Sequence, residues 1–402
     1  MFGVGVAAAV GAAIAGAAVF VTVQLLQAPP ALTFTAAAPA LRVLPGEPPR
    51  PAWPGRAAAA VGTPGTGLLA AHGTGPRPIA SLAKIMTAYV VLRDHPLRLG
   101  QAGPRLAVTA AGVAVYRRDE KQGQSVVKVA GGEHLTEWQA LAALLIPSGN
   151  NIADLLASWD AGSLPAFVAR MNGQGRSLGL QATHYADASG LDPATVSTAA
   201  GQFRLAVRAL QMPVFRQIVA LPQVRLPAAA LAYNVNAGLG YLGIDGVKTG
   251  STPAAGGCLV FSAERTVAGR PATVVGAVLG VPATGAQPSE LAAVITASER
   301  LLRSVGGLER VNVIRPGTVL GRVRTAWGAS TAAVAATGVT ATGWPGMPAR
   351  VTVTALPLHP GIRPGQPIAR ATVRVGGSVS RIRLNASQSV SAPSLTWRLT
   401  RI

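Results

Sequence analysis

Hydrophobic and polar positions follow different periods along this 402-residue chain, and the changes of period divide it into segments. From Ser81 to about Met212 the apolar residues recur three or four positions apart. "LTEWQALAALLI" is typical of this stretch, and it opens on Thr136, a suitable helix cap. Short apolar runs flank it: "AAAAVGT" and "GLLAAHG", joined by "PGTG", precede it as a predicted hairpin. "GIDGVKTGST", "GGCLVFSAER" and "PATVVGAVLGV" follow it as predicted strands. A helical block inserted into a sheet predicts an α+β domain.

The two ends of the chain have patterns of their own. Residues 2–26 carry no charge and are long enough to cross a bilayer, so we predict a transmembrane anchor or signal segment over residues 1–27. A buried helix of a soluble protein is the alternative. Residues 28–56 are rich in Pro and Ala and are predicted to form an extended linker. The α+β domain then occupies residues 57–305, and residues 306–402, where apolar and polar positions alternate between Gly and Pro turns, are predicted to form a small all-β domain.

Charge changes the picture most in this last segment. The chain has a net charge of +20, and the segment holds twelve arginines against one acid, Glu309. In "ARATVRV" and "SRIRL" the arginines alternate with apolar residues, so we expect them on the solvent face of strands. Such a face is either simply solvated or contacts a polyanion, which could be a membrane surface or an anionic wall polymer. No long basic run or stacking-aromatic pattern indicates nucleic acid.

Cysteine and histidine argue against two kinds of site. The single cysteine, Cys258, excludes an intramolecular disulfide and lies in an apolar strand-like run, so we predict a buried core thiol. The histidines show no metal-ligand spacing and stand at positions 72, 95, 134, 184 and 359. The sequence therefore predicts neither a metal nor another cofactor, and it disfavours a zinc carboxypeptidase.

Three short motifs carry candidate chemistry, and the first is "SLAK" at the entrance of a buried helix. Ser81 and Lys84 lie one helical turn apart, so the amine can reach the hydroxyl. A lysine desolvated by apolar neighbours has a lowered pKa and can accept a proton, whereas an arginine stays protonated. Only four of the 35 basic residues are lysines, which makes this position informative. The alternative is a helix-capping serine beside a chance lysine.

The second and third motifs are "PSGN" and "GVKTGST". Ser148 and Asn150 are predicted in a turn between two helices, where a hydroxyl can relay a proton and an amide can bind a peptide. Lys248 is predicted on an edge strand, where an extended peptide could pair and the amine could hold an anionic group. Gly250 would let a backbone approach closely. Taken singly, the motif with Ser148 and Asn150 is better explained as a simple helix break, and a hairpin turn is the alternative for the motif with Lys248.

Taken in order, Ser-x-x-Lys, Ser-x-Asn and Lys-Thr-Gly resemble the penicillin-binding protein and serine β-lactamase superfamily. With "LLIPSGNNIA", "DASGLD" and "GVKTGSTPAAGGC", the stretch from Ala57 to Pro282 resembles the serine-type D-alanyl-D-alanine carboxypeptidases of low molecular mass, in their actinobacterial type. The resemblance implies a transpeptidase domain, peptidoglycan stem peptides ending in D-Ala-D-Ala as substrates, and β-lactams as covalent inhibitors. It also implies a place at the outer face of the cell membrane or in the cell envelope. The C-terminal β domain resembles the family's appended domain only in position and class.

The resemblance further implies a role for each motif residue. The catalytic roles fall on Ser81 as the acyl-ester nucleophile, Lys84 as its general base and Ser148 as a proton relay. The substrate-binding positions are Asn150, Lys248, Thr249, Gly250 and Ser251. Of these, Lys248 and Thr249 would bind the terminal carboxylate, and the backbone N–H groups of Ser81 and Ser251 would form the oxyanion hole. One departure is visible: after "STA" the family usually has an Asp that begins a helix, and this chain has Gly201.

Two other functions compete with this hypothesis. A serine β-lactamase of class A uses a glutamate to activate water, but no glutamate lies between Ser148 and Lys248, and Gly149 stands where that class has Asp. A catalytically silent wall-binding protein of the same fold would not need all three motifs intact. The sequence therefore favours the carboxypeptidase.

Overall fold

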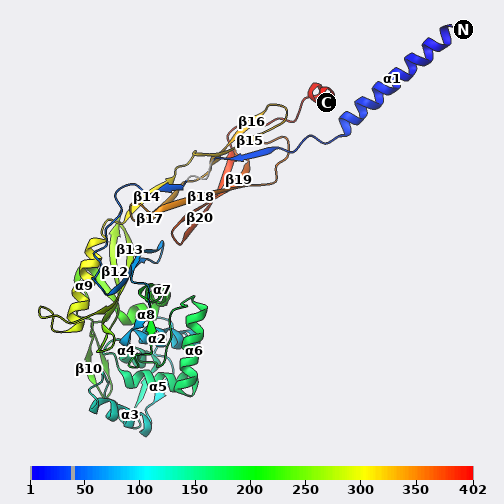
Figure 1. Ribbon diagram of the computed structural model, residues 1–402. Coiled ribbons are helices and arrows are strands. Elements are labelled where there is room, and N and C mark those ends of the chain that lie inside the picture. The colour runs from blue at the N-terminus through cyan, green and yellow to red at the C-terminus, as the bar shows by residue number, and fades with distance from the viewer. Residues whose placement is uncertain (1, 38–40, 402) are drawn as a thin grey trace. The chain divides into compact units, whose positions relative to one another are not determined.

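The computed structural model describes residues 2–37 and 41–401, which divide into two compact units (Figure 1). The motif unit, named for the three motifs it contains, comprises Gly46–Glu309 and Thr342–Pro345. The basic unit comprises Met1–Pro45, Arg310–Ala341 and Gly346–Ile402. Each unit has its own sheet and is described by itself.

An antiparallel five-stranded sheet forms the frame of the motif unit, in the order β11-β12-β13-β3-β4. Its strands are β3 (Ala58–Thr63), β4 (Gly67–His72), β11 (Ile244–Thr252), β12 (Gly256–Val267) and β13 (Arg270–Val281). The hairpin β3–β4 and the three later strands confirm the elements predicted from the apolar runs. β11 lies at the edge of the sheet, as predicted for the strand that carries Lys248.

A helical block is inserted between β4 and β11, also as predicted. Its helices are α2 (Ala83–Asp94), α3 (Ala110–Lys121), α4 (Glu137–Leu145), α5 (Asn150–Ala161), α6 (Leu164–Ser177), α7 (Ala199–Ala209) and α8 (Pro213–Val219). A one-turn 3₁₀ helix, η1 (Ala80–Leu82), precedes α2, and η2 (Tyr241–Gly243) precedes β11. Short paired strands connect the helices: β5 (Arg77–Pro78) with β8 (Val196–Ser197), β6 (Arg105–Ala107) with β7 (His134–Thr136), and β9 (Gln223–Leu226) with β10 (Ala230–Tyr233). The last helix of the unit, α9 (Glu290–Ser304), packs against β12 and β13.

Side-chain caps fix two of the helix starts near the motifs. Thr136 begins α4 with a capping box: its hydroxyl accepts from Gln139 N at 3.2 Å, and the Gln139 side chain accepts from Thr136 N at 2.9 Å. Thr198 begins α7 by accepting from Gly201 N at 3.0 Å. The glycine at position 201 therefore does not weaken this helix start, because the preceding threonine supplies the cap.

The basic unit is built on a seven-stranded antiparallel sheet in the order β1-β15-β16-β20-β19-β18-β2. Its strands are β1 (Thr33–Ala36), β2 (Leu41–Val43), β15 (Val319–Arg324), β16 (Ser330–Ala335), β18 (Pro348–Ala355), β19 (Pro367–Val375) and β20 (Ser378–Ala386). β14 (Glu309–Ile314) pairs separately with β17 (Val339–Gly343), and the chain ends in the short helix α10 (Leu395–Thr400). Alternation of exposed and buried positions along β19 places Arg370 and Arg374 outside and Val373 inside, as the sequence predicts.

The prediction that residues 28–56 form only a linker is wrong for the first part of this segment. β1 pairs with β15, so that Thr33 lies opposite Arg324, and β2 pairs with β18, so that Val43 lies opposite Pro348. The segment therefore supplies two edge strands to the C-terminal sheet. The boundary near residue 306 also needs correction, because Thr342–Pro345 belongs to the motif unit, where the Trp344 indole donates to the Val305 carbonyl at 2.6 Å.

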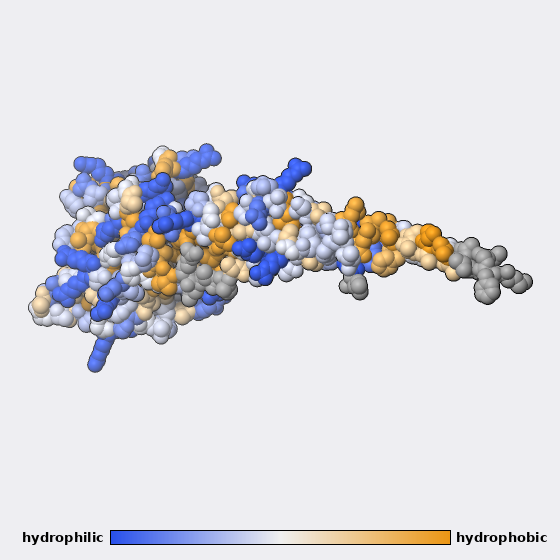
Figure 2. Space-filling model, turned by 90° about the horizontal axis from the view of Figure 1, so that it is seen from above, coloured by the Kyte–Doolittle hydropathy of each residue, from blue (hydrophilic) through white to orange (hydrophobic). Residues whose placement is uncertain are grey.

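The N-terminal helix α1 (Phe2–Leu26) is apolar on all sides and long enough to cross a membrane. Its side chains from Ala9 onward are mostly exposed, and Figure 2 shows them as a predominantly orange, apolar surface. A helix of this length, about 37 Å at 1.5 Å per residue, exceeds the roughly 30 Å of a bilayer core. The described surface of α1 therefore fits a lipid environment better than water.

Candidate active site

Ser81 and Lys84 lie together at the junction of η1 and α2. Lys84 Nζ is 2.9 Å from Ser81 Oγ, as the one-turn spacing predicted. Ser81 is not a helix cap, because it sits within the 3₁₀ turn and its side chain caps neither helix. Its hydroxyl is half-buried beside a completely buried amine. This geometry favours the pairing of a nucleophile with a base over that of a cap with a surface lysine.

Two carbonyl oxygens hold the Lys84 amine in place. Its Nζ donates to Asn150 Oδ1 at 2.6 Å and to the Ser189 carbonyl at 3.0 Å. When the amine is charged, its three hydrogens serve these two carbonyls and the Ser81 hydroxyl; when it is neutral, the carbonyls take its two hydrogens and its lone pair faces the Ser81 hydroxyl. Burial lowers the pKa of Lys84 from 10.5 to about 7, although the negative charges of Asp187 and Asp154 oppose the shift. The amine is thus poised to accept a proton near neutral pH.

The turn between α4 and α5 brings Ser148 and Asn150 to this pair. Ser148 adopts a positive φ of 67°, and its buried Oγ has no hydrogen-bond partner among the described residues. Gly149 is required here, because a Cβ would lie 2.9 Å from side-chain atoms of Val127 and Ile152. Asn150 begins α5 and also donates to Gln124 Oε1 at 2.8 Å. The orphan hydroxyl of Ser148 is available to a bound molecule.

β11 closes the opposite side of the site. Gly250 packs against η1 so tightly that a Cβ would lie 2.7 Å from Ser81 N, which explains the glycine. Lys248 is buried and donates to the Thr249 carbonyl at 3.0 Å. Burial, and then the nearby charge of Lys84, lower the pKa of Lys248 well below 10.5. Thr249 Oγ1 is buried and has no hydrogen-bond partner in the described part of the chain, so this strand also has a polar group available to a ligand.

The structure thus brings the predicted site residues to one place on η1, α2, the α4–α5 turn and β11. Half-buried Ser251 follows Gly250 on β11, where it pairs with Gly257 of β12. Cys258, next along β12, is buried as predicted, and burial raises its thiol pKa to about 12. The predicted core thiol is therefore confirmed.

Two further groups contact the site residues and were not predicted from the sequence: Gln124 and the loop that contains Asp187. The Asp187 carboxylate accepts hydrogen bonds from Ser189 Oγ at 2.7 Å, Gly190 N at 3.0 Å and Thr195 Oγ1 at 2.6 Å. It thereby shapes the loop that offers the Ser189 carbonyl to Lys84. The quoted "DASGLD" contains this loop, but no spacing within it indicates contact with a lysine more than 100 positions earlier.

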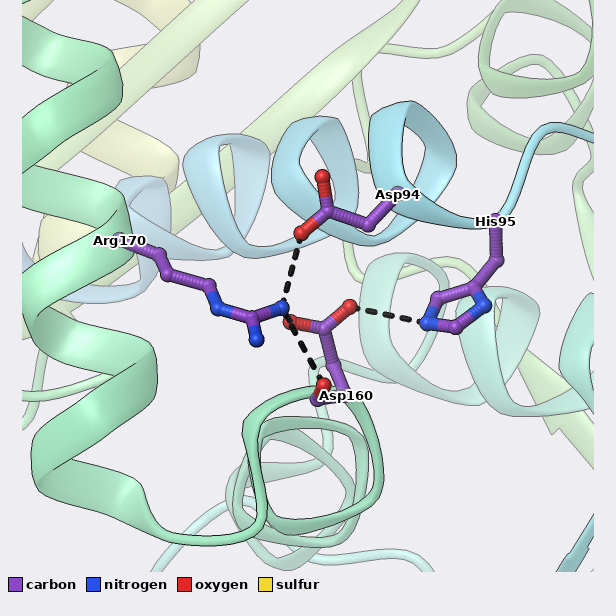
Figure 3. Close-up of polar contacts among 4 residues, drawn as sticks. All are labelled: Asp94, His95, Asp160 and Arg170. Carbon is purple, nitrogen blue, oxygen red and sulfur yellow. Dashed lines mark hydrogen bonds and ion pairs between the residues drawn. The ribbon is translucent and has the colours of Figure 1, made fainter.

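Among the described residues, no group of three or more His, Cys, Asp or Glu side chains is placed to hold a metal ion. Figure 3 shows His95, the histidine at the C-terminal end of α2, whose Nε2 lies 3.1 Å from Asp160 Oδ1. Arg170 of α6 reaches both Asp160 and Asp94, at 2.8 and 3.0 Å. This cluster joins α2, α5 and α6 and accounts for His95 structurally.

Comparison with known families agrees with this geometry. The sequence profile of the peptidase S11 family, described as D-alanyl-D-alanine carboxypeptidase, matches residues 59–281, more than half of the chain. The chain belongs to this family. The S11 family consists of serine hydrolases, and its matched region contains all of the motif residues.

Relatives from several bacteria are similar to this S11 chain over part of their length. It is 32% identical to a D-alanyl-D-alanine carboxypeptidase of Streptomyces sp. (strain K15) over 53% of this chain and 76% of that protein. It is 34% identical to a D-alanyl-D-alanine endopeptidase of Pseudomonas aeruginosa over 46% of this chain, and it spans only 58% of that relative. The S11 resemblance therefore covers the motif unit rather than the whole chain.

Solved structures agree on the fold. The Streptomyces K15 DD-transpeptidase matches with a TM-score of 0.54 and 27% identity, covering 65% of this chain and 99% of that one. Penicillin binding protein 5 from Haemophilus influenzae matches with a TM-score of 0.61 over 86% of this chain and 100% of that one, at 19% identity. The S11 chain thus has the α+β transpeptidase fold and a C-terminal β domain, as predicted.

Proposed function

We propose that this protein is a serine-type D-alanyl-D-alanine carboxypeptidase that removes the terminal D-Ala from peptidoglycan stem peptides. The observation that carries the proposal is the Lys84 amine, which is fully buried, held by two carbonyls and 2.9 Å from the Ser81 hydroxyl. Such an amine can take the hydroxyl proton as Ser81 attacks the penultimate carbonyl carbon. The products of this step are an acyl-enzyme on Ser81 and free D-Ala.

The surrounding residues supply the remaining roles. Ser148, with its unpartnered hydroxyl, passes a proton to the nitrogen of the leaving D-Ala. Asn150 keeps Lys84 in place and orients the substrate. Lys248 and Thr249 bind the terminal carboxylate, and the backbone N–H groups of Ser81 and Ser251 stabilise the oxyanion. Water then hydrolyses the ester, and β-lactams acylate the same serine.

The first experiment labels the full chain with a fluorescent penicillin. We expect the natural chain to be labelled covalently and Ser81→Ala to remain unlabelled while keeping its circular dichroism spectrum. Absence of labelling in the folded natural chain would refute the acyl-enzyme mechanism.

A second experiment separates the carboxypeptidase from a serine β-lactamase. The chain is incubated with a peptide ending in D-Ala-D-Ala and, separately, with benzylpenicillin. We expect catalytic release of D-Ala and slow loss of the penicilloyl group. Rapid turnover of the drug without D-Ala release would favour the β-lactamase, and neither reaction would favour a silent wall-binding protein.

We also propose that α1 anchors the protein, with both units outside the cytoplasmic membrane. Its length, its lack of charge and its exposed apolar side chains support an anchor. A signal sequence passes the same criteria, and N-terminal sequencing of the chain isolated from cells distinguishes the two. Recovery of the chain beginning beyond residue 27 would overturn the anchor.

A further inference from the structure

The C-terminal end of the chain meets the C-terminal end of α1, although the two are more than 370 positions apart in sequence. The Arg398 guanidinium donates to the carbonyls of Leu25 and Gln27. The Arg401 guanidinium donates to the carbonyls of Gln24 and Gln27, each at 3.0 Å. The last carbonyls of a helix lack partners within it and favour a positive charge. Both arginines therefore cap α1, and they fasten α10 to it.

Aromatic side chains extend this contact. The rings of Trp397 on α10 and Trp327 in the β15–β16 turn meet edge to face, with 5.7 Å between their centroids. Arg401 also lies over the Trp397 ring at 5.6 Å, and the Trp327 indole donates to the Ser391 carbonyl at 3.0 Å. Leu395, at the start of α10, is 67% exposed. We call Trp327, Leu395, Trp397, Arg398 and Arg401 the α1 collar.

The collar has the composition of a membrane–water interface. Trp concentrates at the level of lipid headgroups, and Arg near helix ends reaches phosphate while its stem stays in apolar surroundings. Leu26, the last residue of α1, is 80% exposed, so the apolar surface of the helix continues up to the collar. If α1 spans the bilayer, its last turn lies at the interface and the collar lies at the depth of the headgroups.

The positive charge of the basic unit favours lipids with anionic headgroups. In sequence this unit contains no Asp or Glu, and it has thirteen arginines, at 42, 310, 315, 322, 324, 350, 363, 370, 374, 381, 383, 398 and 401. A cationic unit joined to the membrane helix by the six residues 27–32 is attracted to anionic headgroups within a Debye length. Planar guanidinium groups also bind phosphate oxygens well.

We propose that the α1 collar is a docking surface for anionic phospholipid headgroups, which holds the C-terminal end of the chain against the membrane. The proposal rests on the proposed anchoring by α1. The helix α1 sets the position of the membrane–water interface, and the collar adds a second membrane contact from the C-terminal end of the chain. A soluble protein partner seated on the collar is the competing occupant, and the experiment below separates the two.

The test uses the full chain reconstituted into vesicles, with Leu395→Cys carrying a nitrobenzoxadiazole label. Cys258 is buried and its thiol pKa is raised, so the label reacts with the new cysteine. Vesicles contain phosphatidylcholine alone or mixed with phosphatidylglycerol, each with or without brominated acyl chains. In the anionic vesicles we expect blue-shifted emission and quenching by the brominated lipids, at least twice as strong as in phosphatidylcholine alone.

A matched pair of variants separates the collar from the net charge of the unit. Arg398→Gln/Arg401→Gln should reduce the quenching at least two-fold. Arg381→Gln/Arg383→Gln removes the same charge from exposed strand positions and should leave the quenching unchanged. Equal loss in both pairs would overturn the collar as a specific surface, and a blue shift without lipid quenching would indicate a protein occupant instead.

Two measurements on the same vesicles separate this proposal from the proposed function. Extraction of the chain by alkaline carbonate would overturn the anchor and the collar together. Retention in the membrane with water-like emission of the label would overturn the collar alone. Penicillin labelling of Ser81 reports on the enzyme mechanism independently of both results.

Discussion

The lowered pKa of Lys84 gives the sharpest prediction, because it fixes how fast Ser81 reacts with a β-lactam at each pH. The amine must be neutral to accept the proton, and its pKa is about 7. The neutral fraction rises from about 1% at pH 5 to about 90% at pH 8, so we expect acylation to accelerate about 90-fold over this range and then level off. If Lys84 had the ordinary pKa of a lysine, the acylation rate would rise about 1000-fold between pH 5 and pH 8, with no plateau.

The assay is stopped-flow acylation by a chromogenic cephalosporin at constant ionic strength, with the second-order rate constant plotted against pH. Lys84→Arg is the matched control: it keeps a long cationic side chain that cannot lose its proton, so acylation should fall by at least about 1000-fold at pH 8. Thermal unfolding of both proteins checks that the variant is folded.

Two results would refute this reasoning. A rate that keeps rising tenfold per pH unit beyond pH 9 would mean that burial does not lower the pKa of Lys84. A folded arginine variant with near-normal acylation would mean that Lys84 is not the base. Either result would leave the contact between Lys84 and Ser81 in place, but Lys84 would no longer be a general base with a lowered pKa.

Three further substitutions test the supports of the site and the unit. Gly190→Ala should slow penicillin acylation about 100-fold, because φ is +82° and the new Cβ would lie 1.8 Å from the Ala80 carbonyl oxygen, which forces the loop to move. Asp187→Asn should slow acylation and shift its acid limb to lower pH, because the carboxylate raises the pKa of Lys84; the same stopped-flow profile measures both. Glu137→Gln should raise the melting temperature by a few degrees at pH 8 and by less at pH 5. Burial raises the pKa of Glu137 from 4.5 to about 7, so its favourable contribution is present below pH 4.5 and is lost as the pH rises through 7.

Each of these three predictions has an outcome that would contradict it. Normal acylation by Gly190→Ala would show that the loop tolerates the displacement. An acid limb that moves to higher pH in Asp187→Asn would contradict the electrostatic argument. A stability gain for Glu137→Gln that is the same at both pH values would mean that the wild-type carboxyl does not titrate as described.

The contacts and elements that depend on residues close together in the sequence could be predicted. The one-turn spacing placed Lys84 beside Ser81, and Pro147 with Gly149 predicted the turn that presents Ser148. Apolar runs predicted the sheet and the inserted helices. These features depend on neighbours a few residues away, or on burial, and both leave a periodic trace in the sequence.

The unpredicted parts depend on partners far along the chain. The Ser189 carbonyl meets Lys84 only when the fold brings the Asp187 loop back, and no periodicity records that return. β1 has only four residues, three of them exposed, and its short alternation of polar and apolar residues lies within a Pro- and Ala-rich segment that is typical of a linker. Its pairing with β15 is satisfied through the backbone, which carries no sequence signal.

The place of β1 and β2 in the C-terminal sheet has a consequence for how the protein is made. Their partners β15 and β18 begin about 280 and 300 residues later, so a ribosome adding roughly 5–20 residues per second needs about 15–60 s to supply them. The motif unit can collapse during that interval, because its five strands and their helices emerge first. The early strands meanwhile wait with open backbone edges until those partners have been synthesised. Folding of the seven-stranded sheet therefore begins only after β15 and β18 have been synthesised, long after its two edge strands, and the basic unit folds later than the motif unit.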